Sequence, residues 1–204
     1  MDVYVLNSSY QVVSLIDDYK SLIWTKRYFE FGDCELYIKA SLDALGVLKK
    51  GWFLTRNDDD MICRITSVEL DTDAENGNYL IVKGYDCRRI LAQRIIWNQT
   101  NFRGTVENYI RKLVTDNIIS PSVDARKITN FKLGTASGFT DTIDEQATYD
   151  ALDEKVIDLC KTYGYGSRVT LDDDGNFVFT LYQGVDRSYG QETNDYVVFS
   201  PDFD

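Results

Sequence analysis

The chain of 204 residues contains no histidine. This absence excludes, within the chain, every site that needs an imidazole, such as a Ser-His or Cys-His pair or a histidine-ligated metal. Catalysis would have to use carboxylates, Tyr, Lys or Cys, and no convergent nucleophile and base stand out among them. We therefore predict no catalytic residue, no cofactor-binding residue, no metal ligand and no enzymatic activity.

Cysteine, proline and long apolar runs are also scarce. The 4 Cys residues are too widely spaced for a CxxC pair, which argues against a zinc or redox motif and for small buried side chains. Only 2 Pro residues are present, so the chain does not have a disordered composition. No stretch approaches the ~18 apolar residues of a membrane helix, and the N-terminus lacks a signal-peptide pattern. We expect no membrane segment.

Negative charge is in excess and is unevenly distributed. The net charge is −11; residues 1–140 carry 18 basic and 18 acidic residues, whereas residues 141–204 carry 4 basic and 15 acidic ones. A chain this acidic is a poor binder of phosphates, so we expect no specific nucleic-acid binding. The acidic final third is either a solubilising face or a surface that lines a channel or meets a basic partner.

Residues 1–100 have the pattern of many short strands. Aromatic residues make up 13% of the chain, which favours strands, and polar turns separate the apolar runs. We predict short helices at residues 42–48, capped by Ser41, and at residues 87–92, capped by Asp86. Residues 71–78 read as a polar loop. The predicted strands are residues 3–6, 12–16, 21–29, 34–38, 52–56, 61–70, 79–84 and 94–97.

The second half changes character. Apolar residues at helical spacing predict helices over residues 106–119 and 149–163, capped by Thr105 and Thr148, and Gly164 is a C-cap. Asp-Gly within residues 172–176 predicts a hairpin. Further strands are predicted at residues 127–133 and 196–200. The fold class is therefore α+β, mostly antiparallel β: a barrel-like β domain over residues 1–100, then a smaller α+β domain with two helices over residues 101–204.

Two acidic clusters resemble calcium loops but lack essential positions. Asp71, Asp73 and Glu75 alternate as ligands would, and residues 172–174 are also acidic and are followed by Gly175. Neither has both the glycine and the final glutamate of an EF-hand loop, so turns are the favoured interpretation. Carboxylate pairs for hydrolysis need a shared cleft, whereas adjacent acids in turns point apart.

Aromatic and basic groups offer two other candidates. Tyr163, Tyr165 and Tyr182 could form a platform for carbohydrate, although strand tyrosines more often pack in a core or at its rim. The basic group consists of Arg88, Arg89 and Arg94. For these arginines, pairing with nearby carboxylates is favoured over phosphate binding.

Three segments, in this order, resemble a siphophage tail-protein family. They are residues 14–28 (SLIDDYKSLIWTKRY) with residues 32–36 (GDCEL), residues 82–96 (VKGYDCRRILAQRII) and residues 197–204 (VVFSPDFD). Cys34 stands where the family pattern has an aromatic residue. The family pattern continues beyond residue 204, which implies that the chain is the N-terminal portion of a longer protein.

The resemblance implies a baseplate hub-like component of a phage or prophage tail tip, which closes the tail tube and anchors distal parts. It also implies a homotrimeric ring, contacts with distal tail and tape-measure proteins, assembly in the host cytoplasm and a final place in the virion tail. Two other classes stay open on the residues alone. One is a carbohydrate-binding adhesin module, and the other is a carboxylate-based cell-wall hydrolase.

Overall fold

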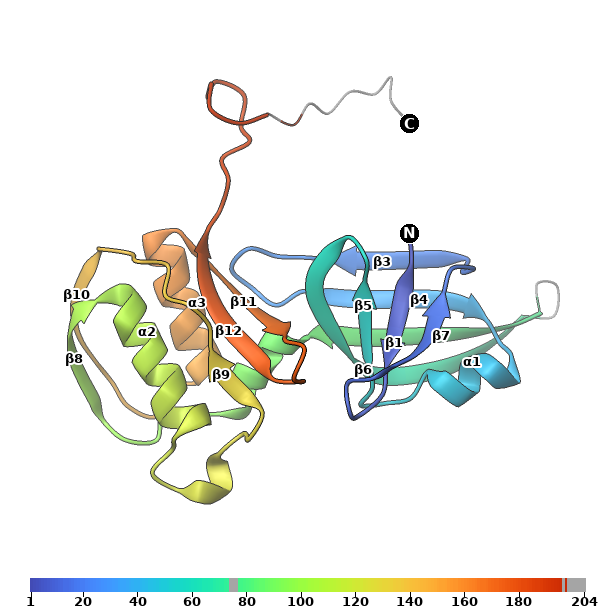
Figure 1. Ribbon diagram of the computed structural model, residues 1–204, viewed down its shortest axis with the longest axis horizontal. Coiled ribbons are helices and arrows are strands. Elements are labelled where there is room, and N and C mark those ends of the chain that lie inside the picture. Colours follow the sequence, from blue (N-terminus) through green and yellow to red (C-terminus); the bar gives the residue numbers. More distant parts are fainter. Residues whose placement is uncertain (74–76, 196, 198–204) are drawn as a thin grey trace.

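The computed structural model describes residues 1–73, 77–195 and 197 and has an α+β fold dominated by antiparallel strands. In Figure 1 the first seven strands lie at one end and the helices α2 and α3 at the other. The elements of the first half are β1 (Val3–Leu6), β2 (Val12–Ile16), β3 (Ser21–Thr25), β4 (Asp33–Lys39), α1 (Leu42–Val47), β5 (Phe53–Arg56), β6 (Asp59–Asp73), β7 (Gly77–Asp86) and the 3₁₀ helix η1 (Cys87–Gln93).

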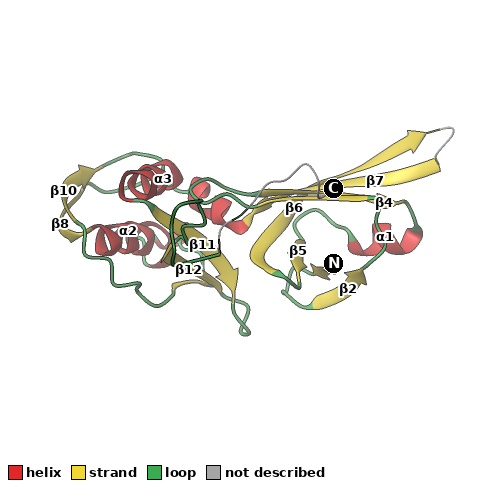
Figure 2. Ribbon diagram, turned by 90° about the horizontal axis from the view of Figure 1, so that it is seen from above, coloured by secondary structure: helices red, strands yellow, loops and turns green. Residues whose placement is uncertain are grey.

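The first seven strands form one antiparallel sheet in the order β2-β1-β5-β6-β7-β4-β3. The sheet is strongly curled, so that β2 and β5 lie opposite β4 (Figure 2). Alternate residues of its strands point into the curl and are buried, as expected for a sheet with one solvated face. Its core includes Val5, Leu36, Leu54, Leu80 and Val82.

The two edges of this sheet are close in sequence. Six antiparallel pairings separate β2 from β3, so the two edge strands run in the same direction. Only residues 17–20 join them. A crossover between parallel neighbours needs a dozen or more residues, and no β2–β3 pairing exists among the described strands. The sheet is therefore open, and the expected barrel is not confirmed.

The second half packs two helices against a small sheet. Its elements are β8 (Thr100–Thr105), α2 (Val106–Val114), the π-helix η2 (Thr115–Ile119), the 3₁₀ helix η3 (Asp124–Arg126), β9 (Phe131–Leu133), β10 (Thr142–Ala147), α3 (Leu152–Tyr163), β11 (Tyr165–Leu171) and β12 (Phe177–Gln183). The strand order is β11-β12-β9, and β9 runs parallel to β12. Helices α2 and α3 contact each other, and α3 also contacts β11 and η1.

The core around these helices extends into the first half. Leu113 of α2 and Phe179 of β12 are fully buried in it, together with Leu6, Phe53 and Leu91 from residues 1–100. Apolar contact therefore continues across the position at which we placed the boundary. The division at residue 100 stays a prediction.

Several predicted elements are confirmed. The Ser41 hydroxyl accepts a hydrogen bond from the Ala44 N–H at 3.0 Å, and Thr105 caps α2 through the Asn108 N–H at 3.3 Å. Gly164 ends α3 with φ 73°, in the left-handed region. Residues 172–176 form the predicted hairpin turn between β11 and β12.

Other predictions are wrong at particular places. Residues 71–73 and 77–78 belong to β6 and β7 rather than to a loop, because the antiparallel register continues to Asp73 and Gly77. Residues 94–97 form only an isolated bridge at Ile95. Helix α3 begins at Leu152, with Ala151 rather than Thr148 at its N-cap. The strand predicted at residues 196–200 lies outside the described residues, except for Val197.

Candidate functional site

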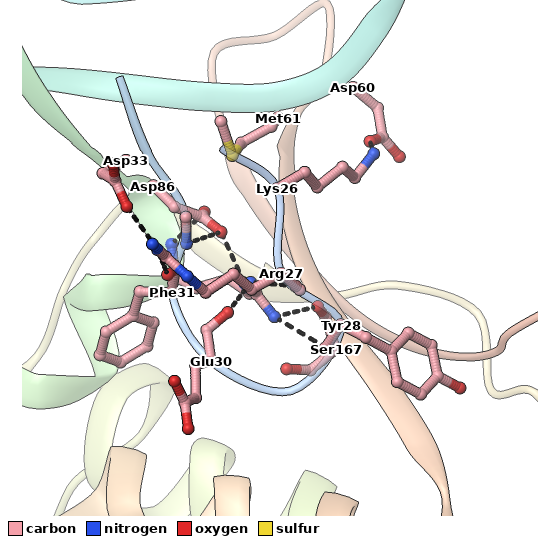
Figure 3. A network of polar contacts seen from close by, with 12 residues as sticks. Lys26, Arg27, Tyr28, Glu30, Phe31, Asp33, Asp60, Met61, Asp86 and Ser167 are labelled. Atoms are coloured by element: carbon pink, nitrogen blue, oxygen red, sulfur yellow. Dashed lines mark hydrogen bonds and ion pairs between the residues drawn. The ribbon is translucent and has the colours of Figure 1, made fainter. Parts of the chain in front are cut away.

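The residues with the strongest polar connections lie where the curled sheet meets the second half. We call this place the junction: residues 26–32 after β3, the start of η1, and β11 (Figure 3). Strand β7 ends at Asp86, whose side chain caps η1 by accepting a hydrogen bond from the Arg88 N–H at 2.9 Å. Its other carboxylate oxygen accepts from Arg88 Nε at 2.6 Å and from the Gly32 N–H at 3.4 Å.

Arg88 is buried, and each of its side-chain N–H groups has an acceptor. Besides Nε, the guanidinium donates to the carbonyls of Tyr28 at 3.3 Å, Ser167 at 2.8 Å and Arg27 at 2.8 Å, and to that of Glu30. Five donors are the full capacity of an arginine side chain. The Arg88 and Asp86 side chains are only 3% and 5% exposed. One buried ion pair thus links a loop, a helix and a strand that lie far apart in the sequence.

Ion pairs at the rim of the junction join the same parts. Asp60, on β6, contacts Lys26 and also Arg168 on β11 at 2.8 Å. Burial acts to raise the pKa of Asp60, but the hydrogen bonds and charges of Lys26 and Arg168 outweigh it and hold that pKa below its usual value. Because these groups are partly exposed, each pair contributes little by itself.

Small residues allow the backbone segments to come close. A Cβ on Gly166 would lie 2.5 Å from the Tyr28 ring and 2.6 Å from the Tyr182 ring. A Cβ on Gly32 would lie 2.4 Å from the Thr25 carbonyl oxygen. A larger side chain at Gly166 would push β11 away from the Tyr28 loop, and one at Gly32 would push that loop away from the end of β3. The Tyr28 hydroxyl then bridges the segments, donating to the Gly164 carbonyl at 2.9 Å and accepting from the Gly184 N–H at 2.7 Å.

The junction is sealed rather than hollow. The space beside Arg88 and Ser167 has a volume of about 10 Å³, which is too small for a substrate. The junction therefore has a structural role. Its buried cation, which is neutralised and fully hydrogen-bonded, fixes two parts of the chain relative to each other. Within the described ranges, no three His, Cys, Asp or Glu residues are grouped so that they could hold a metal ion.

The structure separates the arginines that we grouped. Arg88 is buried in the junction, paired with a carboxylate as we favoured. Arg89 is exposed, with its guanidinium carbon 4.0 Å from the centre of the Tyr85 ring. Arg94 donates to the Arg126 carbonyl at 2.7 Å. Nothing in the sequence indicated that Arg88 would contact carbonyls of distant residues. Only the sequence Asp86-Cys87-Arg88 at the helix cap indicated that Arg88 could pair with a nearby carboxylate.

The tyrosine platform that was the less favoured alternative does not form as one surface. Tyr165 is buried and stacks on Phe139 at 4.0 Å between ring centres, and its hydroxyl donates to Asp141. Tyr182 instead packs edge to face with Tyr28 at 5.4 Å. Only Tyr163 remains beside Tyr165, at 6.2 Å. The packing interpretation of these tyrosines is the one that fits.

The cysteines are free and buried, which confirms their interpretation as small apolar side chains. Burial raises the pKa of Cys63, Cys87 and Cys160 above its usual value; for Cys63 a hydrogen bond with Cys34 contributes even more. For Cys160 the pKa reaches about 12. Thiols with raised pKa values are poor nucleophiles, since the thiolate is the reactive form.

The acidic turn at residues 172–176 is held by its own hydrogen bonds. The Asp172 carboxylate pairs with Lys132 and accepts from the Asn176 N–H at 2.8 Å. The pKa of Asp172 is lowered from 3.8 to about 2. The main cause is the hydrogen bond from Lys132, and the hydrogen bond from the Asn176 backbone N–H contributes next. The carboxylate therefore stabilises the turn in its ionised form.

This shift makes the contribution of Asp172 dependent on pH. A folded-state pKa below the unfolded value adds stability above about pH 4, and that stability is lost as the pH falls towards about 2. We expect Asp172→Asn to destabilise the chain by a constant amount above about pH 5 and by progressively less below pH 4. Urea unfolding of both proteins at several pH values measures this difference. Asp173→Asn, the same change on the neighbouring exposed residue, is the control; a pH-independent gap for Asp172→Asn would contradict the expectation.

No described helix has the length and apolar character required to cross a membrane. The chain resembles solved tail proteins in fold. It superposes on the prophage tail protein gp18 from Listeria monocytogenes EGD-e with a TM-score of 0.57 at 10% identity, covering 88% of this chain and 50% of the other. It also superposes on a tail protein from Neisseria meningitidis MC58 with a TM-score of 0.51 at 16% identity, covering 87% and 49%.

The chain thus spans about half the length of these solved proteins. A search of curated proteins found no match. The decisive comparison is at the family level, where residues 2–204 match the family described as Siphovirus ReqiPepy6 Gp37-like protein. This confirms the resemblance to siphophage tail proteins seen in the three sequence segments. The chain belongs to the family of siphovirus ReqiPepy6 Gp37-like proteins.

Proposed function

We propose that the chain is the N-terminal part of a structural tail-tip protein, a hub-like component that closes the tail tube and anchors distal tail parts. The observation that carries the proposal is the family match over residues 2–204, and the fold likeness to two tail proteins supports it. Its place is the virion tail, after assembly in the host cytoplasm. Its partners are other tail proteins, such as distal tail and tape-measure proteins. The proposal assigns no catalytic step to the chain.

The proposed hub domain is residues 1–100, and residues 101–204 form the second domain. The topology supports a barrel-like role for the first. Because β2 and β3 run in the same direction and only residues 17–20 separate them, the stretch from residue 12 to residue 25 pairs with one edge of the sheet and then with the other. Residues 17–20 thus connect the two edges of the open, curled sheet directly. The junction around Arg88 suits this role, since a ring component under load needs parts that stay fixed.

The assembled form in this proposal is a ring of three copies, with the acidic final third directed partly towards the lumen. The support for the lumen is the charge distribution, with no net charge over residues 1–140 and −11 over residues 141–204. Like charge repels DNA phosphates over a Debye length of about 8 Å, so that DNA passes without binding.

The test is an image of the assembled particle. In virions of the phage or prophage that encodes the protein, mass spectrometry should detect it and cryo-electron microscopy should place three copies around the tube end. A full-length protein that stays monomeric and is missing from purified virions would exclude the hub role. A ring whose residues 172–174 all face outward would exclude the lumen arrangement while leaving the hub role in place.

A further inference from the structure

A groove on the surface beside η1 has no role in the junction or in the proposed ring. Its larger part is a cavity of about 500 Å³ whose lining includes Arg64, Tyr85, Arg89 and Ile90. A second hollow of about 260 Å³ is lined partly by Tyr10, Phe53, Asn130 and Phe177. Arg64, Ile90 and Gln93 line both. The two hollows are therefore adjacent, and we call them together the arginine groove.

The arginine groove contains two cations without a carboxylate partner. Arg64 on β6 lies opposite Tyr85 on β7 in the strand register, and the Arg89 guanidinium lies over the Tyr85 ring. Across the part of the chain that the structure describes, neither arginine forms an ion pair. Asp86, the only carboxylate in the lining, is buried and bound to Arg88. Both side chains are exposed, so the groove presents two cations and no accessible carboxylate.

The rest of the lining is apolar or carries amides. Tyr10, Ile90 and Ile128 are partly buried and offer apolar surface. The Gln93 amide, which lines both hollows, makes no side-chain hydrogen bond within the described residues. Apolar walls with a few oriented polar groups are typical of ligand sites. A guanidinium suits a carboxylate, which it can bind in a bidentate manner, and a free amide suits a peptide backbone. Two cations are too few for a nucleic-acid backbone, whose affinity comes from many phosphate contacts.

We propose that the arginine groove binds an extended segment of a partner protein in which carboxylate side chains alternate with apolar ones. The carboxylates meet Arg64 and Arg89, and the apolar side chains lie on Tyr10, Ile90 and Ile128. The Gln93 amide forms hydrogen bonds with the backbone of the segment. Charge complementarity selects the occupant, since the net charge of −11 disfavours acidic partners in general while the two arginines of the groove favour a carboxylate locally. The proposal does not depend on the tail-tip role.

The test uses a fluorescein-labelled peptide that alternates glutamate with leucine, and the same peptide with glutamine in place of glutamate. Fluorescence anisotropy on the full chain measures both affinities. We expect the glutamate peptide to bind about tenfold more tightly than the glutamine peptide, a preference that weakens with added salt. The variant R64Q/R89Q should lose this preference. Both residues are exposed, so the variant should fold, and circular dichroism verifies that it does.

The matched control is R103Q/R187Q, which removes the same charge from two exposed arginines outside the groove. It should keep the tenfold preference. Three results would overturn the proposal: no saturable binding of the glutamate peptide, equal loss of preference in both double variants, or tighter binding of a single-stranded oligonucleotide that R64Q/R89Q abolishes.

Discussion

Replacing Arg88 with alanine is expected to lower the free energy of unfolding by about 3–5 kcal/mol. The change leaves the Asp86 carboxylate buried without its cation and deprives four backbone carbonyls of their donor. Uncompensated buried charge is among the costliest consequences of a single substitution. Urea unfolding followed by circular dichroism measures the loss.

Two further variants make this result specific. Arg88→Lys keeps the charge but has only three donors, so it should recover part of the loss and not all of it. Arg103→Ala removes an exposed arginine that lies 3.9 Å from Asp144, and it should change stability by no more than about 1 kcal/mol. If Arg88→Ala were no more harmful than Arg103→Ala, the junction would not be what holds the two parts together.

Truncating the helix core should have an effect of similar size. Leu113 of α2 and Leu159 of α3 are buried in the cluster that also contains Phe179, so each change to alanine removes apolar contact and leaves a cavity. We expect a loss of about 2–5 kcal/mol for each. The loss lies nearer the lower end of this range where the neighbouring side chains move to fill the cavity.

The matched control for this pair is Leu42→Ala in α1, where the leucine is 88% exposed. The same chemical change there should alter stability by about 0.5 kcal/mol or less. Thermal or chemical unfolding of the three variants gives the comparison. Equal stability of Leu113→Ala and Leu42→Ala would mean that the apolar face of α2 does not form the core.

The sequence predicted the elements whose causes are local. The hydroxyl of Thr105, the glycine at position 164 and the Asp-Gly turn each act within a few residues, so α2, the end of α3 and the β11–β12 hairpin could be located. Strands β8 and β10 were missed because few apolar residues mark them: the pairing of Thr100–Thr105 with Thr142–Ala147 spans about forty residues. The parallel pairing of β9 with β12 is equally non-local.

The site was less predictable than the fold for the same reason. The prediction that the arginines pair with nearby carboxylates is confirmed for Arg88, whose partner Asp86 is two residues away. Nothing in the sequence placed the carbonyls of Arg27 and Ser167 around it, because those contacts join segments 61 and 79 residues distant. Arg64 and Arg89 meet at one groove only because Tyr85 stands opposite Arg64 in the sheet register.

The short connection between β2 and β3 determines how the curled sheet comes apart. In most open sheets each edge strand frays independently, since the opposite edge is distant. Here residues 17–20 tether the two edges, so an edge strand that peels away pulls on the strand at the other edge. Loosening of the sheet at β2 and at β3 is therefore one event, and the amide hydrogens of the two strands should exchange with solvent together.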